Sequence, residues 1–127
     1  MKTLVVTAAV VERDGRFLVT RRLEGTHLGG YWEFPGGKCE PGETIAACLT
    51  RELEEELGVG ASVGDEILTT THAYPDRSVE LHFLSCALHG TPVPQNGQEM
   101  RWVPREELAT LRFPPADDEL IKILTLG

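Results

Sequence analysis

One segment, residues 37–59, constrains the fold of this chain more than any other. Apolar side chains recur within it at every fourth position, as the buried side of a helix requires. These positions are Ile45, Leu49, Leu53 and Leu57. Good helix formers fill the positions between them, and Gly58 supplies a stop signal. The segment therefore predicts a helix over Thr44–Leu57 with one face in the core.

The polar side of this helix carries carboxylates at a fixed spacing. Glu52, Glu55 and Glu56 stand at positions i, i+3 and i+4 and share one face, whereas Glu54 points to roughly the opposite side. Like charges at these spacings destabilise an isolated helix by a few tenths of a kcal/mol per pair. A cation bound between them would remove this repulsion. Mg²⁺ is a suitable cation because it prefers oxygen ligands and bridges carboxylates to phosphates.

Seven positions in this region have a joint spacing that chance rarely produces. They are Gly37, Glu43, Arg51, Glu52, Glu55, Glu56 and Gly58. At background frequencies of roughly 6–7% per residue type, the set would coincide about once in 10⁸ starting points. The preceding turn, Pro35–Gly37, also fits a metal site, because glycines let main-chain carbonyls approach an ion without Cβ clashes.

This run resembles the Nudix box without a single departure, with Leu53 and Val59 at its two aliphatic positions. Flanking segments are similar to MutT-type members of that family and occur in the same order. They are Thr20–Arg22, Trp32–Lys38, Tyr74–Arg77 and Phe113–Ala116. The resemblance implies an α/β Nudix fold, a mixed β-sheet sandwiched between α-helices, as a single domain over residues 1–127.

The resemblance also implies a metal site and its chemistry. Its ligands would be Glu52, Glu55, Glu56 and the carbonyl of Gly36. Arg51 would orient the box carboxylates, and Arg22 would contact phosphate. In the family, divalent ions, here Mg²⁺ or alternatively Mn²⁺, neutralise the phosphate chain and activate water. The products would be a nucleoside monophosphate and pyrophosphate.

The sequence leaves the general base open. MutT-type enzymes carry a glutamate in the loop after the last long strand, and the matching position here is Asn96, which cannot act as a base. Glu99 is the nearest substitute if the loop shifts, although it also fits a solvated strand residue. Alternatively, Glu55 or Glu56 removes the proton.

A second departure concerns the nucleobase. The MutT pattern has an asparagine after the Pro-Pro-Ala segment, and this sequence has Asp117. An ionised carboxylate only accepts hydrogen bonds, so it admits both cytosine and guanine, and Nudix enzymes that act on CTP-like substrates resemble this form. The same residue also fits an N-cap of the last helix.

Five further side chains are candidates for the nucleotide pocket. Trp32, Phe34 and Tyr74 could stack on a base, although aromatic residues on short strands more often belong to the core. Arg77 and Glu33 are polar candidates of similar standing.

The leading hypothesis is a nucleotide-pool-cleaning hydrolase of oxidised (d)NTPs such as 8-oxo-dGTP, which protects DNA. The alternative in the same class is hydrolysis of (d)CTP or 5-substituted CTP. ADP-ribose, dinucleoside polyphosphates and RNA 5′ ends are further Nudix substrates that the box does not separate. A non-catalytic nucleotide-binding regulator is disfavoured because the box acids are intact.

Composition limits the partners. A net charge of −8 disfavours stable binding to nucleic acid or anionic lipid, and the chain contains no apolar stretch long enough for a membrane span. A cytoplasmic protein with a small-molecule nucleotide partner is expected, and the oligomeric state is left open. Three cysteines without C-x-x-C spacing, at 39, 48 and 86, are expected to be free thiols.

Periodicity and turn signals outside the box predict the remaining elements. Strands are expected in a hairpin of Thr3–Glu12 with Phe17–Thr20, at Tyr31–Phe34, in a hairpin of Glu66–Tyr74 with Ser78–Leu88, and at Met100–Val103. Helices are expected from Pro104 to Leu111 and from Pro114 onward.

Overall fold

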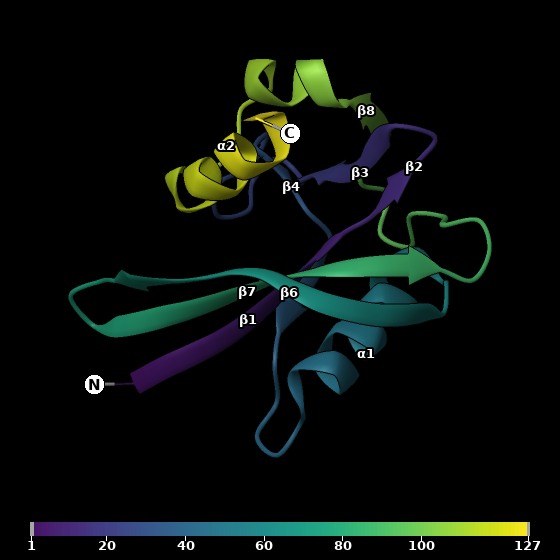
Figure 1. Cartoon of the computed structure of the whole chain (residues 1–127). Helices are drawn as coiled ribbons and strands as arrows, with labels where there is room; N and C mark the ends of the chain where they lie inside the picture. Colours follow the sequence, from purple (N-terminus) through teal and green to yellow (C-terminus); the bar gives the residue numbers. More distant parts are fainter. Residues whose placement is uncertain (1, 127) are drawn as a thin grey trace.

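The computed structural model describes residues 2–126 (Figure 1). Its strands are β1 (Lys2–Val10), β2 (Glu12–Arg13), β3 (Arg16–Arg21), β4 (Trp32–Glu33), β5 (Gly36–Lys38), β6 (Ala61–Ala73), β7 (Arg77–Leu88) and β8 (Met100–Pro104). Its helices are α1 (Ile45–Leu57), two 3₁₀ segments η1 (Arg105–Thr110) and η2 (Pro115–Asp117), and α2 (Asp118–Leu126).

The strands form two sheets rather than the one that the sequence suggested. The larger sheet has the order β5-β1-β7-β6, with β1 parallel to β7 and the other pairs antiparallel. The smaller sheet has the order β2-β3-β4, with β8 also paired to β3. The larger sheet is therefore mixed, as expected for this α/β fold.

The turn of the first predicted hairpin is confirmed. The pairing predicted for the strand before that turn is wrong. Asp14 and Gly15 both have positive φ, 54° and 76°, and join β2 to β3 as a tight hairpin turn does. Most of the predicted strand, however, is β1, which pairs with β5 and β7 in the other sheet. The reason is burial: residues 7–11 are buried without interruption, which suits a central strand covered on both faces.

Two apolar clusters cover opposite faces of the larger sheet. Alternate residues of β1 divide between them, with Ala8 on one face and Ala9 on the other. One cluster contains the buried side of α1, and the other contains the buried side of α2 (Figure 1). The larger sheet thus lies between the two helices, which confirms the expected sandwich.

The helix of the box forms where the sequence predicts it. Thr44 is its N-cap and accepts a hydrogen bond at Oγ1 from the main-chain N–H of Ala47 at 3.1 Å. Gly58 ends the helix in the left-handed conformation, at φ 61°, and its N–H donates to the Glu54 carbonyl. Both boundaries of the predicted helix are confirmed.

The other predicted elements are present with shifted boundaries. The β6–β7 hairpin is confirmed, although β6 begins at Ala61 rather than Glu66. The helix expected after Pro104 is the 3₁₀ segment η1, and the C-terminal helix begins with the 3₁₀ turn η2 before α2. Among residues 2–126, no helix has both the length and the apolar character needed to cross a bilayer.

The expectation of three free thiols is wrong for two of them. Cys39, just after β5, and Cys48, on α1, form a disulfide with their Cα atoms 5.2 Å apart. The fold brings them together because the loop after β5 returns across the start of α1. Cys86 is a free, buried thiol, and burial raises its pKa to about 11.

We predict that the disulfide stabilises the fold by cross-linking a short loop in the unfolded chain. The loop-entropy relation for a separation of 9 residues gives about 2–3 kcal/mol. Reduction should lower the free energy of unfolding of the wild type by that amount, which a lower urea midpoint at unchanged m would show. Cys39→Ser should be equally destabilised and should no longer respond to the reductant. A wild-type midpoint that is unaffected by full reduction, verified by thiol titration, would contradict this assignment.

Candidate active site

Arg51 ties the loop before α1 to the helix itself. Its guanidinium forms a bidentate pair with Glu43, at 2.7 Å from Nε and 2.9 Å from Nη2. Nη1 donates to Glu52 at 3.0 Å and to Glu55 at 3.2 Å, and Nη2 also donates to the Lys38 carbonyl at 3.0 Å. Every polar atom of this guanidinium therefore has a partner in the box.

Glu43 is the most strongly stabilised anion of this network. The paired Arg51 guanidinium and the main-chain N–H of Glu40 together lower the pKa of Glu43 to about 2. The same contacts raise the pKa of Arg51 above its ordinary value. Both groups stay charged at any pH at which the protein is used, so the loop and helix remain joined.

The glycines of the box are required by close packing. A Cβ at Gly36 would collide with the main chain of Thr7 and Ala8 on β1. A Cβ at Gly37 would collide with the carboxylate of Glu52. The main chain of β5 can therefore lie directly against the acidic face of α1, and the N–H of Gly36 donates to Glu56 Oε2 at 3.3 Å.

Glu56 differs from the other box acids because no cation of the protein pairs with it among the described residues. Burial, followed by the nearby carboxylates of Glu33 and Glu52, raises its pKa to about 8. Burial also raises the pKa of Glu52, although Arg51 opposes this effect. The face of α1 thus combines a carboxylate that lacks a counter-ion with others that share one arginine.

The chemistry of these donors fits a hard divalent cation. Glu52, Glu55, Glu56 and the Gly36 carbonyl offer oxygen atoms along one side of the box, which is the ligand type that Mg²⁺ prefers. Glu55 and Glu52 face Arg51, and within residues 2–126 no three Asp, Glu, His or Cys side chains are grouped closely enough to enclose a metal. The metal-ligand roles therefore stay predictions.

A large cavity of about 520 Å³ lies beside the box. All six residues that the sequence singles out for substrate binding line it, and they come from four separate segments of the chain. These residues are Arg22, Glu33, Phe34, Tyr74, Arg77 and Asp117. Trp32 does not line it, because its side chain is buried in the core. Phe34 also belongs to the core, where it stacks on Phe113 with ring centroids 5.3 Å apart.

Two of the acids that line this cavity, Asp117 and Glu33, have raised pKa values. Asp117 is only 7% exposed, and burial, together with the nearby Glu33 and Asp118, raises its pKa to about 7. Burial also raises the pKa of Glu33, although Arg22 pairs with it at 3.1 Å and lowers it. Asp117 makes no side-chain hydrogen bond within residues 2–126, so its carboxyl is available to a ligand.

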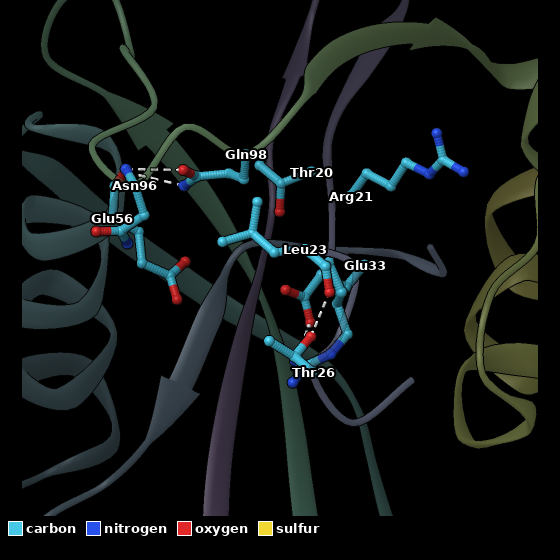
Figure 2. A pocket seen from close by; sticks show the side chains of 9 residues that line it. Thr20, Arg21, Leu23, Thr26, Glu33, Glu56, Asn96 and Gln98 are labelled. Atoms are coloured by element: carbon cyan, nitrogen blue, oxygen red, sulfur yellow. Dashed lines mark hydrogen bonds and ion pairs between the residues drawn. The ribbon is translucent and has the colours of Figure 1, made fainter. Parts of the chain in front are cut away.

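A second, smaller cavity of about 160 Å³ lies on the other side of Glu56. Asn96 and Gln98, from the loop before β8, line it together with Glu56, and Figure 2 shows Asn96 beside Glu56. Glu99 does not line this cavity, because its carboxylate pairs with Arg21 at 3.5 Å. Gln98 was missed by the sequence reading, since its place in the site depends on how the loop folds.

The sequence and the fold agree with one family. A model of the NUDIX domain matches residues 6–122. The chain is 37% identical to the CTP pyrophosphohydrolase of Escherichia coli over 96% of its own length and 91% of that protein. It is also 37% identical to the 8-oxo-dGTP diphosphatase of Haemophilus influenzae, over 94% of this chain and 90% of that protein.

Solved structures extend the similarity to the fold. The solution structure of the E. coli ORF135 protein superposes with a TM-score of 0.87 at 37% identity, covering 96% of this chain and 88% of that one. A MutT protein from methicillin-resistant Staphylococcus aureus superposes with a TM-score of 0.81 at 33% identity, covering 99% and 98%. The chain belongs to the Nudix hydrolase family, whose members generally use divalent metal ions.

We predict that Glu43 makes the fold sensitive to acid. Its folded-state pKa of about 2 lies below the ordinary value of 4.5, so its contribution to stability is complete above pH 4.5 and is lost as the pH falls toward 2. Glu43→Gln should therefore lower the urea midpoint at pH 7 and differ much less from wild type at pH 3. Glu54→Gln, at an exposed position of the same helix, is the control; equal losses at both pH values in Glu43→Gln would oppose this interpretation.

Proposed function

We propose that this protein is a MutT-type nucleoside triphosphate pyrophosphohydrolase that uses Mg²⁺, with Mn²⁺ as an alternative ion. One observation carries the proposal: Glu56, a half-buried box carboxylate that forms no ion pair within residues 2–126, lies in the wall of a cavity with both apolar and charged side chains. A nucleoside can occupy the apolar part while its phosphates reach the box. The activities named for the relatives in E. coli and H. influenzae support the same reaction class.

In this mechanism, the box residues hold the ion and the phosphates are placed by arginine. Glu52, Glu55, Glu56 and the Gly36 carbonyl would hold Mg²⁺, which when bound neutralises phosphate charge and acidifies water. Arg51 orients the carboxylates, and Arg22, at the edge of the large cavity, binds the phosphate chain. An oxygen of water bonds to phosphorus, the P–O bond between the α- and β-phosphates breaks, and the water proton passes to a base.

Glu55 and Glu56 are the candidate bases on the face of α1 that would hold the ion, since a base must lie within reach of the attacking water. Glu99 is less well placed, because its carboxylate pairs with Arg21.

For the substrate, we propose an oxidised purine nucleotide such as 8-oxo-dGTP, with (d)CTP or 5-substituted CTP as the alternative. Asp117 supports both, because a carboxyl with a pKa of about 7 is present as donor and as acceptor near neutral pH. Relatives named for each substrate are equally similar to this chain. The cellular role would be cleaning of the nucleotide pool, in the cytoplasm and without stable nucleic-acid binding, by one domain spanning residues 1–127.

If the box is catalytic, replacing one of two nearby glutamates of α1 should lower kcat strongly, and replacing the other should not. Glu56→Gln should lower kcat for the best nucleotide by at least about 100-fold, since metal-assisted charge stabilisation is worth several kcal/mol. Glu54→Gln, exposed on the other side of the helix, should retain wild-type activity. The assay is pyrophosphate release with Mg²⁺ from a panel of dNTPs, 8-oxo-dGTP and 5-substituted CTPs, and formation of AMP for ADP-ribose. No turnover of any nucleotide by the wild type would refute the proposal.

The base preference should depend on Asp117. Asp117→Asn replaces a group that changes its protonation near pH 7 with an amide that both donates and accepts at every pH. The ratio of kcat/KM for 8-oxo-dGTP to that for CTP should change by about 10-fold or more, as for one altered polar contact. Glu119→Gln, at an exposed position of α2, is the control. If the ratio is the same in Asp117→Asn and wild type, Asp117 does not contact the base.

A further inference from the structure

Two anchors join the box loop, the segment between β5 and α1, to the helix, and one of them is covalent. The Cys39–Cys48 disulfide ties the start of the loop to the first part of α1. The other anchor is the Arg51 guanidinium, which binds the Lys38 carbonyl and the Glu43 carboxylate. A loop held in this way opens away from the helix only when both anchors are released, so each one supports the other.

The two sulfurs of the disulfide differ in their access to solvent. Cys48 is 0% exposed, whereas Cys39 is half-buried and lies between two exposed residues, Lys38 and Glu40. The rate of thiol–disulfide exchange depends on which sulfur is attacked and on access to it. Cys39 is therefore the sulfur that an incoming thiol reaches, and Cys48 is the sulfur that leaves.

The hydroxyl of Thr7, on β1, lies beside the leaving sulfur. Thr7 is 1% exposed, its Oγ1 is 3.5 Å from Cys48 Sγ, and it donates to the Gly37 carbonyl at 3.4 Å. A disulfide sulfur carries no hydrogen, so the hydroxyl is the donor in the contact with Cys48. When the S–S bond breaks, this sulfur becomes a thiolate, and hydrogen bonds to ionised acceptors are stronger than those to neutral ones. Thr7 is thus placed to stabilise the leaving group.

The fold also accommodates the reduced pair. Cys48 Sγ lies 3.9 Å from the Gly37 carbonyl, which is an acceptor for a thiol at this position. Opening the disulfide costs about 2–3 kcal/mol of stability, less than the roughly 5–15 kcal/mol of a typical domain. The chain therefore stays folded after reduction, and the change is confined to the box loop.

We propose that Cys39–Cys48 is a thiol-exchange site, opened by a dithiol reductant, whose oxidation state determines how far the box loop depends on Arg51. A thiolate of the reductant bonds to Cys39 Sγ, the S–S bond breaks, and its electron pair leaves on Cys48 Sγ, which takes a proton from water. The second thiolate of the reductant then attacks the reductant sulfur of the mixed disulfide and releases Cys39 as a thiolate. The reductant ends as a cyclic disulfide, and two electrons have passed to the protein.

The place of this site in the box gives it a consequence for activity. Arg51 holds the loop through Glu43 and also holds two acids of the box, Glu52 and Glu55. After reduction the arginine alone keeps the loop and these acids together. This consequence rests on the proposed function, in which the reduced enzyme should hydrolyse its nucleotide more slowly than the oxidised one. In the proposed cytoplasmic location, disulfides are mostly transient or redox-sensing, which agrees with a switch.

Hydrogen exchange measured by mass spectrometry tests the coupling of the two anchors. Reduction of the wild type with dithiothreitol opens one anchor, and Glu43→Gln weakens the other, so each change alone should speed exchange of the box-loop amides only slightly. Reduced Glu43→Gln should exchange at least about 10-fold faster than the product of the two single effects, as for coupled sites. Cys86→Ala should respond to the reductant like wild type, and Cys39→Ser should not respond. Effects that simply multiply, or a loop that does not respond in any variant, would overturn the switch.

A second experiment identifies the attacked sulfur and the role of Thr7. Brief reaction with 2-mercaptoethanol and an acid quench should place the added thiol on Cys39 in peptide mass spectra; an adduct on Cys48 would overturn the assigned direction of attack. Thr7→Val should slow reduction by dithiothreitol about 10-fold, as for loss of a hydrogen bond to a charged group. Thr125→Val, on α2, is the matched control and should be reduced at the wild-type rate. An unchanged rate in Thr7→Val would refute its role.

Nucleotide hydrolysis by the oxidised and reduced wild type separates this proposal from the proposed function. Equal rates in the two states would overturn the consequence for activity. If neither state hydrolyses any nucleotide, the proposed function fails, whereas the exchange and adduct measurements still decide whether the disulfide controls the box loop.

Discussion

The pairing of Arg51 with Glu43 determines how the rest of the site is arranged. Isolated surface ion pairs contribute roughly 0–1 kcal/mol, but this pair is bidentate, partly buried and linked to further carboxylates. It holds the loop against α1, and the close approach of β5 follows from that position. Because one arginine serves three glutamates, the helix can carry its acids on a single face without a metal. The arginine does not reach Glu56, which is left facing the two cavities.

The cavity beside the box concentrates negative charge where burial makes it costly. Glu56 and Asp117 have pKa values of about 8 and 7, and Glu33 depends on Arg22 for its neutralisation. Buried acids of this kind destabilise a fold, and proteins keep them where function requires it. In the proposed function, a polyanionic substrate would add to the same repulsion, and a divalent cation together with Arg22 would offset it.

Local sequence patterns predicted the elements that are determined by residues close together in the sequence. The four-residue repeat, Thr44 and Gly58 give α1 its boundaries, and alternation with a turn signal gives the β6–β7 hairpin. The division into two sheets was not predicted, because it depends on which distant strands pair with β1. The disulfide was missed for the same reason: Cys39 and Cys48 meet only after the loop folds over α1.

The residues of the candidate site also fall into two groups: those that local spacing brings together and those that only the fold brings together. The box acids and Arg51 lie within one segment, so spacing alone brings them together, whereas Thr20 and Gln98 reach the smaller cavity from β3 and from a loop. Asp117, which lines the larger cavity, comes from η2, far from the box in sequence. In the proposed function, chemistry and base recognition would therefore be carried by separate elements that can change independently. Two relatives, each 37% identical to this chain, are named for different substrates. Such a difference is expected if base recognition can change independently of the chemistry. Identity over the whole chain reflects the shared box and fold, and in the proposed function the few side chains of the cavity wall would determine which nucleotide is cleaved.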